Sequence, residues 1–201
     1  MLMNPRIMPI FAVLMPLTVM SQSSSQNYTL AETLLDPQGS HALQSVQYYD
    51  GFGRPSVSVS KGVSPSGAGV YSLREYDGLG RESDNWLPVA SGSSLDYVSA
   101  QALKSLSSSF YSDSRAYTHS DYDSRSRVVM KQGAGESWWN GSHAQQKSYR
   151  LNNQGEVKKY TAPCDGSYSL LQSGFYNKEV LTVEEAADED GKSVLSYKDI
   201  L

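Results

Sequence analysis

The sequence has little of what disulfide-linked or metal-bound folds need. Its 201 residues contain one cysteine, Cys164, which cannot form an internal disulfide, and three histidines without zinc-ligand spacing. Lys+Arg 17 are scattered and outnumbered by Asp+Glu 21, so the composition offers no basic face for nucleic acid. We therefore expect no cofactor, no metal site and no nucleic-acid partner.

The sequence also lacks an apolar run long enough to cross a bilayer. The stretch Ile7–Met20 follows one charge, Arg6, and is too short for a spanning helix, which needs about 20 residues. A short basic start before such a stretch is typical of a secretory signal peptide. We predict a signal helix over residues 1–21, cleaved after Ser21, and an exported protein that is secreted, periplasmic or on the cell surface, with no stable membrane span after cleavage. An uncleaved anchor is the alternative.

Tyrosine and glycine, by contrast, come in a repeated pattern. The hexapeptide Tyr49-Asp50-Gly51-Phe52-Gly53-Arg54 recurs as Tyr76-Asp77-Gly78-Leu79-Gly80-Arg81. A weaker copy, residues 122–127, keeps the Tyr-Asp start and the final Arg but has no glycine. Self-similarity of this kind indicates repeated supersecondary units.

The chemistry of the hexapeptide predicts a β-hairpin turn. Asp-Gly between strand-like flanks is a strong turn signal, because glycine accepts a positive φ and the carboxylate can bind nearby backbone N–H groups. We expect Tyr49 and Arg54 to face each other, with the guanidinium over the ring. Replacing Gly51 or Gly78 with valine should then lower the melting temperature. This interpretation makes the motif residues structural rather than ligand-binding.

The flanking residues favour an antiparallel β-fold. Residues 56–60 alternate serine and valine, which places Val57 and Val59 on one face of a strand. Further hairpins are expected around Asn152–Gly155 and Ala186–Gly191. One short helix is expected over Leu95–Tyr111, because apolar residues recur there at a spacing of four: Val98, Ala102, Leu106 and Phe110.

The predicted fold class is therefore mainly β: antiparallel hairpins or a meander of YD-type repeats, with one short helix and the N-terminal signal helix. The chain divides into a signal peptide (1–21), an N-terminal lead segment (22–44) and a β-hairpin domain (45–201).

The paired hexapeptides resemble those of RHS/YD-repeat proteins. Four segments in order extend the resemblance over roughly residues 27–201: Tyr48–Pro55, Leu73–Pro88, Arg127–Trp138 and Asp188–Asp199. Together they look like the N-terminal domain, of unknown function, of RHS-repeat proteins from Bacteroides-type bacteria. Relatives continue into further repeats, whereas this chain stops at residue 201, so the resemblance implies a truncated chain. It also implies downstream RHS repeats or other envelope proteins as partners.

Other candidate sites each have a simpler structural explanation. Asp36-Pro37-Gln38-Gly39 resembles half of a self-cleavage motif but is also ordinary turn chemistry. His119 with Asp121 and Asp123, or His143 near the tryptophans, could suggest metal or acid–base work. Residues 188–191 suggest calcium but lack the later bidentate glutamate. Trp138 and Trp139, with Tyr149, could form an aromatic sugar platform, although packing is the favoured use.

These observations favour a non-catalytic structural module that scaffolds or caps a larger β-assembly. The alternative is an adhesin-like surface that binds a glycan or an envelope partner through exposed tyrosine and tryptophan. No nucleophile, paired-carboxylate or phosphate-loop motif indicates an enzyme. An unpaired edge strand near residues 194–197 is expected to make the module prone to self-association.

Overall fold

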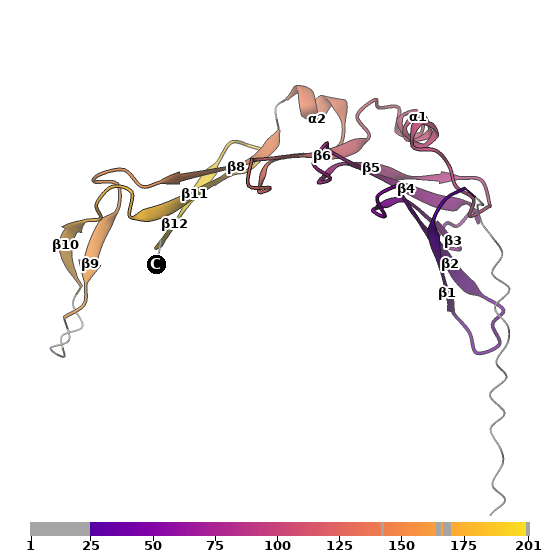
Figure 1. Cartoon of the computed structure of the whole chain (residues 1–201), viewed down its shortest axis with the longest axis horizontal. Helices are drawn as coiled ribbons and strands as arrows, with labels where there is room; N and C mark the ends of the chain where they lie inside the picture. The colour runs from indigo at the N-terminus through magenta and orange to yellow at the C-terminus, as the bar shows by residue number, and fades with distance from the viewer. Residues whose placement is uncertain (1–24, 142, 164–165, 167–169, 200–201) are drawn as a thin grey trace, which may run out of the picture.

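The computed structural model describes residues 25–141, 143–163, 166 and 170–199. Within these residues the chain forms a 10-stranded sheet whose strand pairs are all antiparallel, bent into an arch with both helices on its outer side (Figure 1). The prediction of a mainly antiparallel β-fold is confirmed. The predicted signal helix and Cys164 lie outside the described residues.

The sheet is a meander with one excursion. From one edge to the other its strands are β1 (Tyr28–Leu34), β2 (Ala42–Tyr49), β3 (Pro55–Lys61), β4 (Gly69–Tyr76), β5 (Glu82–Ser91), β6 (Tyr117–Tyr122), β7 (Val128–Gln132), β8 (Ala144–Leu151), β11 (Leu181–Ala187) and β12 (Ser193–Asp199). The excursion after β8 forms a separate two-stranded sheet of β9 (Lys158–Thr161) and β10 (Leu171–Phe175). The helices are α1 (Ala100–Tyr111), between β5 and β6, and α2 (Glu136–Asn140), between β7 and β8.

The core lies on one face of the first six strands. Cross-strand partners form a continuous apolar row: Tyr28, Tyr48, Val57, Leu73, Trp86 and Tyr117. Val57 and Val59 are both fully buried, which confirms the alternation expected for residues 56–60. The serines between them lie on the opposite face, because successive side chains of a strand alternate. Each strand thus adds one or two apolar side chains to a single layer.

The segment between β5 and β6 covers this layer. Leu95 is buried in it, and its carbonyl accepts a hydrogen bond from the Tyr48 hydroxyl at 2.7 Å. Burial raises the pKa of Tyr48 to about 12. The predicted helix over Leu95–Tyr111 therefore begins later, at Ala100, where the Ser99 hydroxyl caps the helix by accepting from the Ala102 N–H at 3.4 Å.

The apolar residues at a spacing of four do not form the buried face of this helix. Leu103 and Ser107 face the sheet, whereas Leu106 and Phe110 are exposed. The small Ser107 side chain lets α1 approach closely, and its hydroxyl donates to the Leu87 carbonyl at 3.3 Å. The second helix, α2, was not expected at all. Among the described residues no helix is long and apolar enough to cross a bilayer.

The hairpin predicted around Asn152–Gly155 is also wrong, because β8 pairs with β11 and β9 pairs with β10. The reason is the buried side chain of Asn152. Its Oδ1 accepts from the N–H groups of Val180 and Leu181, and its Nδ2 donates to the Asn177 carbonyl at 2.8 Å. These bonds tie the end of β8 to the start of β11 and leave the residues between as an excursion.

Candidate functional site

The most regular feature of the molecule is a set of three turns, which we call the Asp turns: Asp50–Arg54, Asp77–Arg81 and Asp123–Arg127. In the first, the Gly53 N–H donates to the Asp50 carbonyl at 3.0 Å and the Asp50 N–H donates to the Arg54 carbonyl at 2.9 Å. Gly53 has φ +77°, a left-handed conformation. The pattern is a β-turn followed by a glycine bulge, and the other two turns repeat both hydrogen bonds.

The aspartate side chain holds each turn closed. In the second, Asp77 Oδ1 accepts the N–H groups of Leu79 and Arg81, both at 2.9 Å, and Oδ2 accepts the Arg81 Nε at 2.7 Å. Hydrogen bonding from the Arg81 N–H holds the pKa of Asp77 below its ordinary value, against the effect of desolvation. The carboxylate is therefore fully occupied in tying the turn to its own arginine.

The other two Asp turns have the same electrostatics. The Arg127 N–H and guanidinium lower the pKa of Asp123. At Asp50 desolvation is the largest influence and raises the pKa, but hydrogen bonds from Arg54 and Phe52 together outweigh it and the net shift is downward. All three carboxylates are thus stabilised in the ionised form.

Each arginine also contacts the next hairpin. The guanidinium carbon lies over the tyrosine ring of the following repeat: Arg54 over Tyr76 at 4.3 Å, Arg81 over Tyr122 at 4.7 Å and Arg127 over Tyr149 at 3.7 Å. We call these three contacts the Arg–Tyr relay. The expected stacking of Arg54 on Tyr49 within one turn is wrong, because the guanidinium, fixed by Asp50, points along the row of turns.

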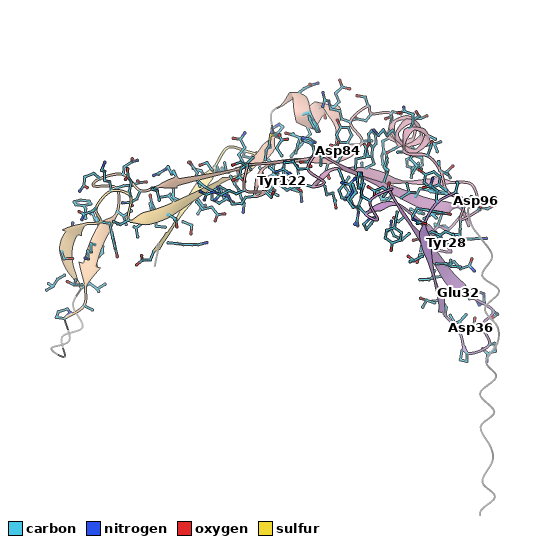
Figure 2. All side chains as sticks on the ribbon, viewed as in Figure 1. Tyr28, Glu32, Asp36, Asp84, Asp96 and Tyr122 are labelled. Atoms are coloured by element: carbon cyan, nitrogen blue, oxygen red, sulfur yellow. The ribbon has the colours of Figure 1, made fainter. Side chains whose placement is uncertain are left out.

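Hydrogen bonds reinforce the relay. The Tyr76 hydroxyl donates to the Pro55 carbonyl at 2.6 Å, and the Tyr122 hydroxyl donates to the Glu82 carbonyl at 2.7 Å. In addition, Arg81 Nη1 donates to the Asp123 carbonyl at 2.9 Å. Figure 2 places Tyr122 near the crown of the arch, so the relay runs from the β1 arm, where Glu32 and Asp36 are labelled, through its centre.

The structure assigns different roles to the motif glycines. Gly53 and Gly80 have positive φ, whereas Gly51 and Gly78 do not, and nothing lies within 4 Å of a Cβ built on either. A Cβ at Gly51 or Gly78 would therefore meet no neighbouring atom, and the lower melting temperature expected for valine at these positions stays a prediction. A Cβ on Gly80 would lie 3.0 Å from Arg54 Nη1, so the second glycine also makes room for the preceding arginine.

The weaker copy is a complete Asp turn despite its lack of glycine. Ser126 takes the position of Gly53 with φ +60°. The signals that remained in the sequence were the Tyr-Asp start and the final arginine, and these are the three side chains that make the contacts. Tyr149, the last ring of the relay, carried no motif of its own.

Two further aspartates close turns without the relay, and of these only the turn at Asp188 repeats both backbone hydrogen bonds. At Asp188 the carboxylate accepts the N–H groups of Asp190 and Lys192, so the suggested calcium loop is a closed turn. At Asp36 it accepts the N–H groups of Ser40 and His41, and the Ser40 N–H leads the interactions that lower its pKa. The half-motif resembling a cleavage site is thus a turn between β1 and β2.

Near the C-terminal end of the described chain, three side chains bind one another: Arg150, Glu156 and Tyr197. The Glu156 carboxylate binds the Arg150 guanidinium, with Nη1 at 2.9 Å, and accepts from the Tyr197 hydroxyl at 2.9 Å. Arg150 and Tyr197 are both register partners of the buried Val183, so this carboxylate clasp bridges β8 and β12. Hydrogen bonding to Arg150 lowers the pKa of Glu156 to about 2. No motif in the sequence indicated the clasp.

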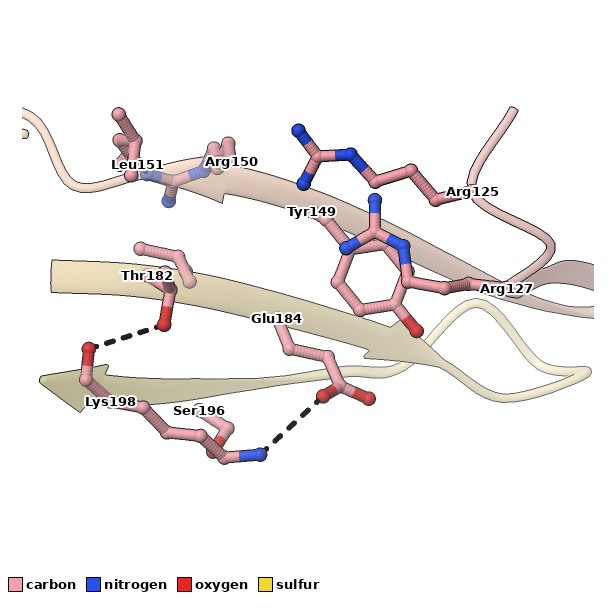
Figure 3. Close-up of a pocket in the computed structure, with 10 residues that line it drawn as sticks. Arg125, Arg127, Tyr149, Arg150, Leu151, Thr182, Glu184, Ser196 and Lys198 are labelled. Carbon is pink, nitrogen blue, oxygen red and sulfur yellow. Dashed lines mark hydrogen bonds and ion pairs between the residues drawn. The ribbon is translucent and has the colours of Figure 1, made fainter. Parts of the chain in front are cut away.

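A groove of about 610 Å³ lies beside the last step of the relay (Figure 3). Its wall includes Tyr149 with Arg127 over the ring, and Lys198 Nζ lies 3.8 Å from a Glu184 carboxylate oxygen. Arg127 is already paired with Asp123, and the other cations that line the groove are Arg125, Arg150 and Lys198. Most of the positive charge is therefore engaged within the fold.

The predicted aromatic pair is split between two environments. Trp139 packs against Tyr117 at 5.5 Å and under Arg115 at 4.3 Å, whereas Trp138 stacks on His143 at 4.6 Å and is 41% exposed. Tyr149 lies toward the other end of β8, under Arg127. The three rings do not make one platform.

His119 is held between two carboxylates. Its Nδ1 lies 2.6 Å from Asp84 Oδ1 and its Nε2 lies 3.1 Å from Asp121 Oδ1, while Trp139 packs against the ring. Asp123, the third residue suggested by the sequence, belongs to an Asp turn instead. In the part of the chain that the structure describes, no group of three or more His, Cys, Asp or Glu side chains could hold a metal ion.

Comparison with known proteins adds one match. A family model described as a domain of unknown function (DUF6443) matches residues 21–151. No curated protein matches the chain, and no solved structure matches it. The matched segment contains all three Asp turns and ends just after Tyr149, the last ring of the Arg–Tyr relay.

Proposed function

The chain belongs to the DUF6443 family, and we propose that it is a non-catalytic structural module at the N-terminus of an exported RHS-repeat protein. In this role its hairpins scaffold or cap a larger β-assembly at or beyond the cell envelope. The partners would be downstream RHS repeats or other envelope proteins.

The observation that carries the proposal is the Arg–Tyr relay. In each Asp turn the carboxylate binds its own arginine, and the guanidinium lies over a tyrosine ring of a later strand of the same sheet. A catalytic site requires groups that face a substrate, whereas these groups are satisfied by turn N–H groups and by neighbouring rings. The repeated chemistry therefore serves to fix one hairpin against the next.

The relay also supports the resemblance to RHS/YD repeats. In these contacts the final arginine of one turn meets the tyrosine ring of a later strand, and the aspartate of the turn holds that arginine in place. A repeat whose last side chain binds the first side chain of the next repeat can be extended indefinitely in one direction. This property suits a scaffold built from many hairpins.

The test is to express the full chain in a bacterium together with a polypeptide of consecutive Tyr-Asp-x-x-Gly-Arg hairpins. We expect the chain in the envelope or secreted fraction, beginning at Gln22, and co-purifying with the hairpin polypeptide. Arg81→Lys keeps the charge but loses the planar fork, so it should weaken co-purification. Trp138→Ala is the matched control and should leave it unchanged.

Two results would contradict the proposal. One is retention of the unprocessed chain in the cytoplasm, or its failure to co-purify with the hairpin polypeptide. The other is binding to a glycan array that Trp138→Ala abolishes and Arg81→Lys leaves intact, which would favour the adhesin-like alternative.

A further inference from the structure

The two outermost strands of the sheet, β1 and β12, lie at opposite ends of the strand order. Each is paired along one side only among the described strands, and Figure 1 shows them on opposite arms of the arch. An open strand edge presents a row of backbone donors and acceptors that can template another strand. The question is which strand fits each edge.

The number of strands decides the direction of any partner. Because all neighbours are antiparallel and the sheet has 10 strands, β1 and β12 run in opposite directions. When a second copy is placed with its β1 beside β12 of the first, the two strands are antiparallel and the alternation continues. An odd number of strands would have made this junction parallel.

The same placement keeps the two faces of the sheet in register. On the core face, β1 presents Leu30 and Leu34, and β12 presents Leu195 and Tyr197, whose partner is the buried Val183. Both strands have 7 residues. Paired over their full length, Tyr197 lies opposite Leu30 and forms an apolar cross-strand pair, whereas Leu195 lies opposite Glu32 and Leu34 opposite Ser193.

Neither edge is interrupted by a proline or a bulge, and its charged side chains are few: Glu32 in β1, and Lys198 and Asp199 in β12. Edge strands are commonly interrupted by proline, by bulges or by several lysines. β1 has no proline or lysine, β12 has a single lysine, Lys198, and the pairing of each with its neighbour shows no register shift. Both expose large apolar side chains: Val194 is 72% exposed and Leu34 is 61% exposed.

We propose that β12 of one copy pairs antiparallel with β1 of a second copy, head to tail, so that the sheet continues from molecule to molecule. The inference rests on the proposed scaffold function, because it names a second copy of this chain as a component of the β-assembly. A two-fold pairing of like edges would put the Asp turns of the two copies on opposite borders of the sheet. Head-to-tail pairing keeps them along one border.

The experiment uses two edge variants, each with lysines at two exposed positions of one strand. Ala31→Lys with Thr33→Lys charges β1, and Val194→Lys with Ser196→Lys charges β12. Gln172→Lys with Ser173→Lys, in the separate β9–β10 sheet, is a control with the same change of charge. Circular dichroism and thermal melting show that each variant remains folded.

Molar mass is then measured by light scattering over about a hundredfold range of concentration, wide enough to reveal a micromolar association. The parent and the control should grow beyond a dimer as concentration rises. Each edge variant alone should stay monomeric, because one of its two edges is blocked. A mixture of the two should give a 1:1 dimer and nothing larger, because only one compatible pair of edges remains.

Three outcomes would overturn the inference. A parent that stays monomeric at every concentration has no edge-to-edge contact. An edge variant that dimerises alone uses a two-fold contact between like edges. A control that is also monomeric shows a general effect of charge. None of these outcomes bears on export or on co-purification with hairpin repeats, so the inference can fail while the proposed function stands.

Discussion

At the scale of single residues, the Asp turns depend on one backbone position more than on the pair of glycines that defines the motif. Gly53 and Gly80 occupy the left-handed region, and Ser126 is forced into it in the third turn. A side chain with a Cβ costs about 1–2 kcal/mol in that region. The third turn is thus held closed by Asp123 and Arg127 against the preference of its own backbone.

Ser126→Gly should therefore stabilise the protein. The gain is the relief of left-handed strain less the greater entropy of glycine in the unfolded chain, which leaves about 0.5–1 kcal/mol. Urea unfolding followed by tyrosine and tryptophan fluorescence measures it. Ser124→Gly, at the position of Gly51, has no strain to relieve and is the control; an equal gain there would contradict the explanation.

His119 should make stability depend on pH. Desolvation lowers its pKa, but hydrogen bonds that the ring donates to Asp84 and Asp121 outweigh this and raise the pKa above 6.5. The facing groups are Asp84 on β5, Asp121 on its own strand, Gln132 on β7 and Trp139 on α2. A raised pKa in the folded state means that the contribution to stability is complete below the unfolded value and disappears as pH rises through the folded value.

The melting temperature should consequently fall as the pH is raised from below 6.5 into the alkaline range. His119→Gln, which cannot be protonated, should show a flatter profile over the same interval. An identical slope in both proteins would assign the pH dependence to other groups.

At the scale of elements, the Arg–Tyr relay predicts that one tyrosine couples two hairpins. Tyr122→Leu removes the ring under Arg81 and the hydroxyl bond to Glu82, with an expected loss of about 1–2 kcal/mol. Tyr122→Phe keeps the ring and should lose only the hydrogen bond, about 1 kcal/mol. Equal losses in the two variants would show that the cation–ring contact contributes nothing.

The carboxylate clasp predicts sensitivity of the C-terminal strands to acid. The pKa of Glu156 is lowered to about 2, so its contribution is complete above its ordinary value of 4.5 and is lost as pH falls through about 2. Glu156→Gln should remove this dependence and raise hydrogen exchange in β12 at neutral pH, because Arg150 and Tyr197 lose their common partner. Unchanged exchange in β12 would show that other contacts hold the strand.

At the scale of the whole molecule, burial is concentrated in one arm of the arch. The buried apolar cluster draws on β2 to β5 together with Leu95 and Leu103, whereas the side chains of β9 and β10 are almost all exposed. Local opening should follow this gradient, since segments with few buried contacts open at low free energy. Hydrogen exchange should be slowest in β3 and β4 and fastest in β9 and β10.

Leu73→Ala tests the same gradient by mutation. Leu73 lies in the middle of the cross-strand row and is almost fully buried, so its truncation should cost about 2–5 kcal/mol. Leu171→Ala, at an exposed site in β10, should change stability by less than about 0.5 kcal/mol. Comparable losses at the two sites would mean that β9–β10 is packed more tightly than its exposure indicates.

The strands with alternating or motif-bound residues could be predicted from the sequence, because their signals are local. Val57 and Val59 alternate with serines, and the Asp turns follow from short-range hydrogen bonds. What could not be predicted depends on contacts between distant residues. Arg54 meets Tyr76 only when neighbouring turns are in register, and the partner of β8 is decided by Asn152 binding residues far along the chain.

Helix α1 could likewise be predicted only in part. Its existence followed from composition, but its buried face did not, because Leu103 and Ser107 are selected by how closely α1 can approach the sheet. The apolar residues at spacing four, ending at Phe110, point elsewhere.

The hydrogen bonds of the Asn152 side chain have a consequence for insertions into the chain. The Asn152 side chain joins the two ends of the excursion between β8 and β11, and Glu156 ties the first part of the excursion to Arg150 and Tyr197. Beyond these contacts, β9 and β10 pair only with each other. Inserted material there would extend outward without disturbing any pairing in the main sheet. The β9–β10 hairpin is thus the place at which a tag or a foreign loop can be grafted with the least effect on the main sheet.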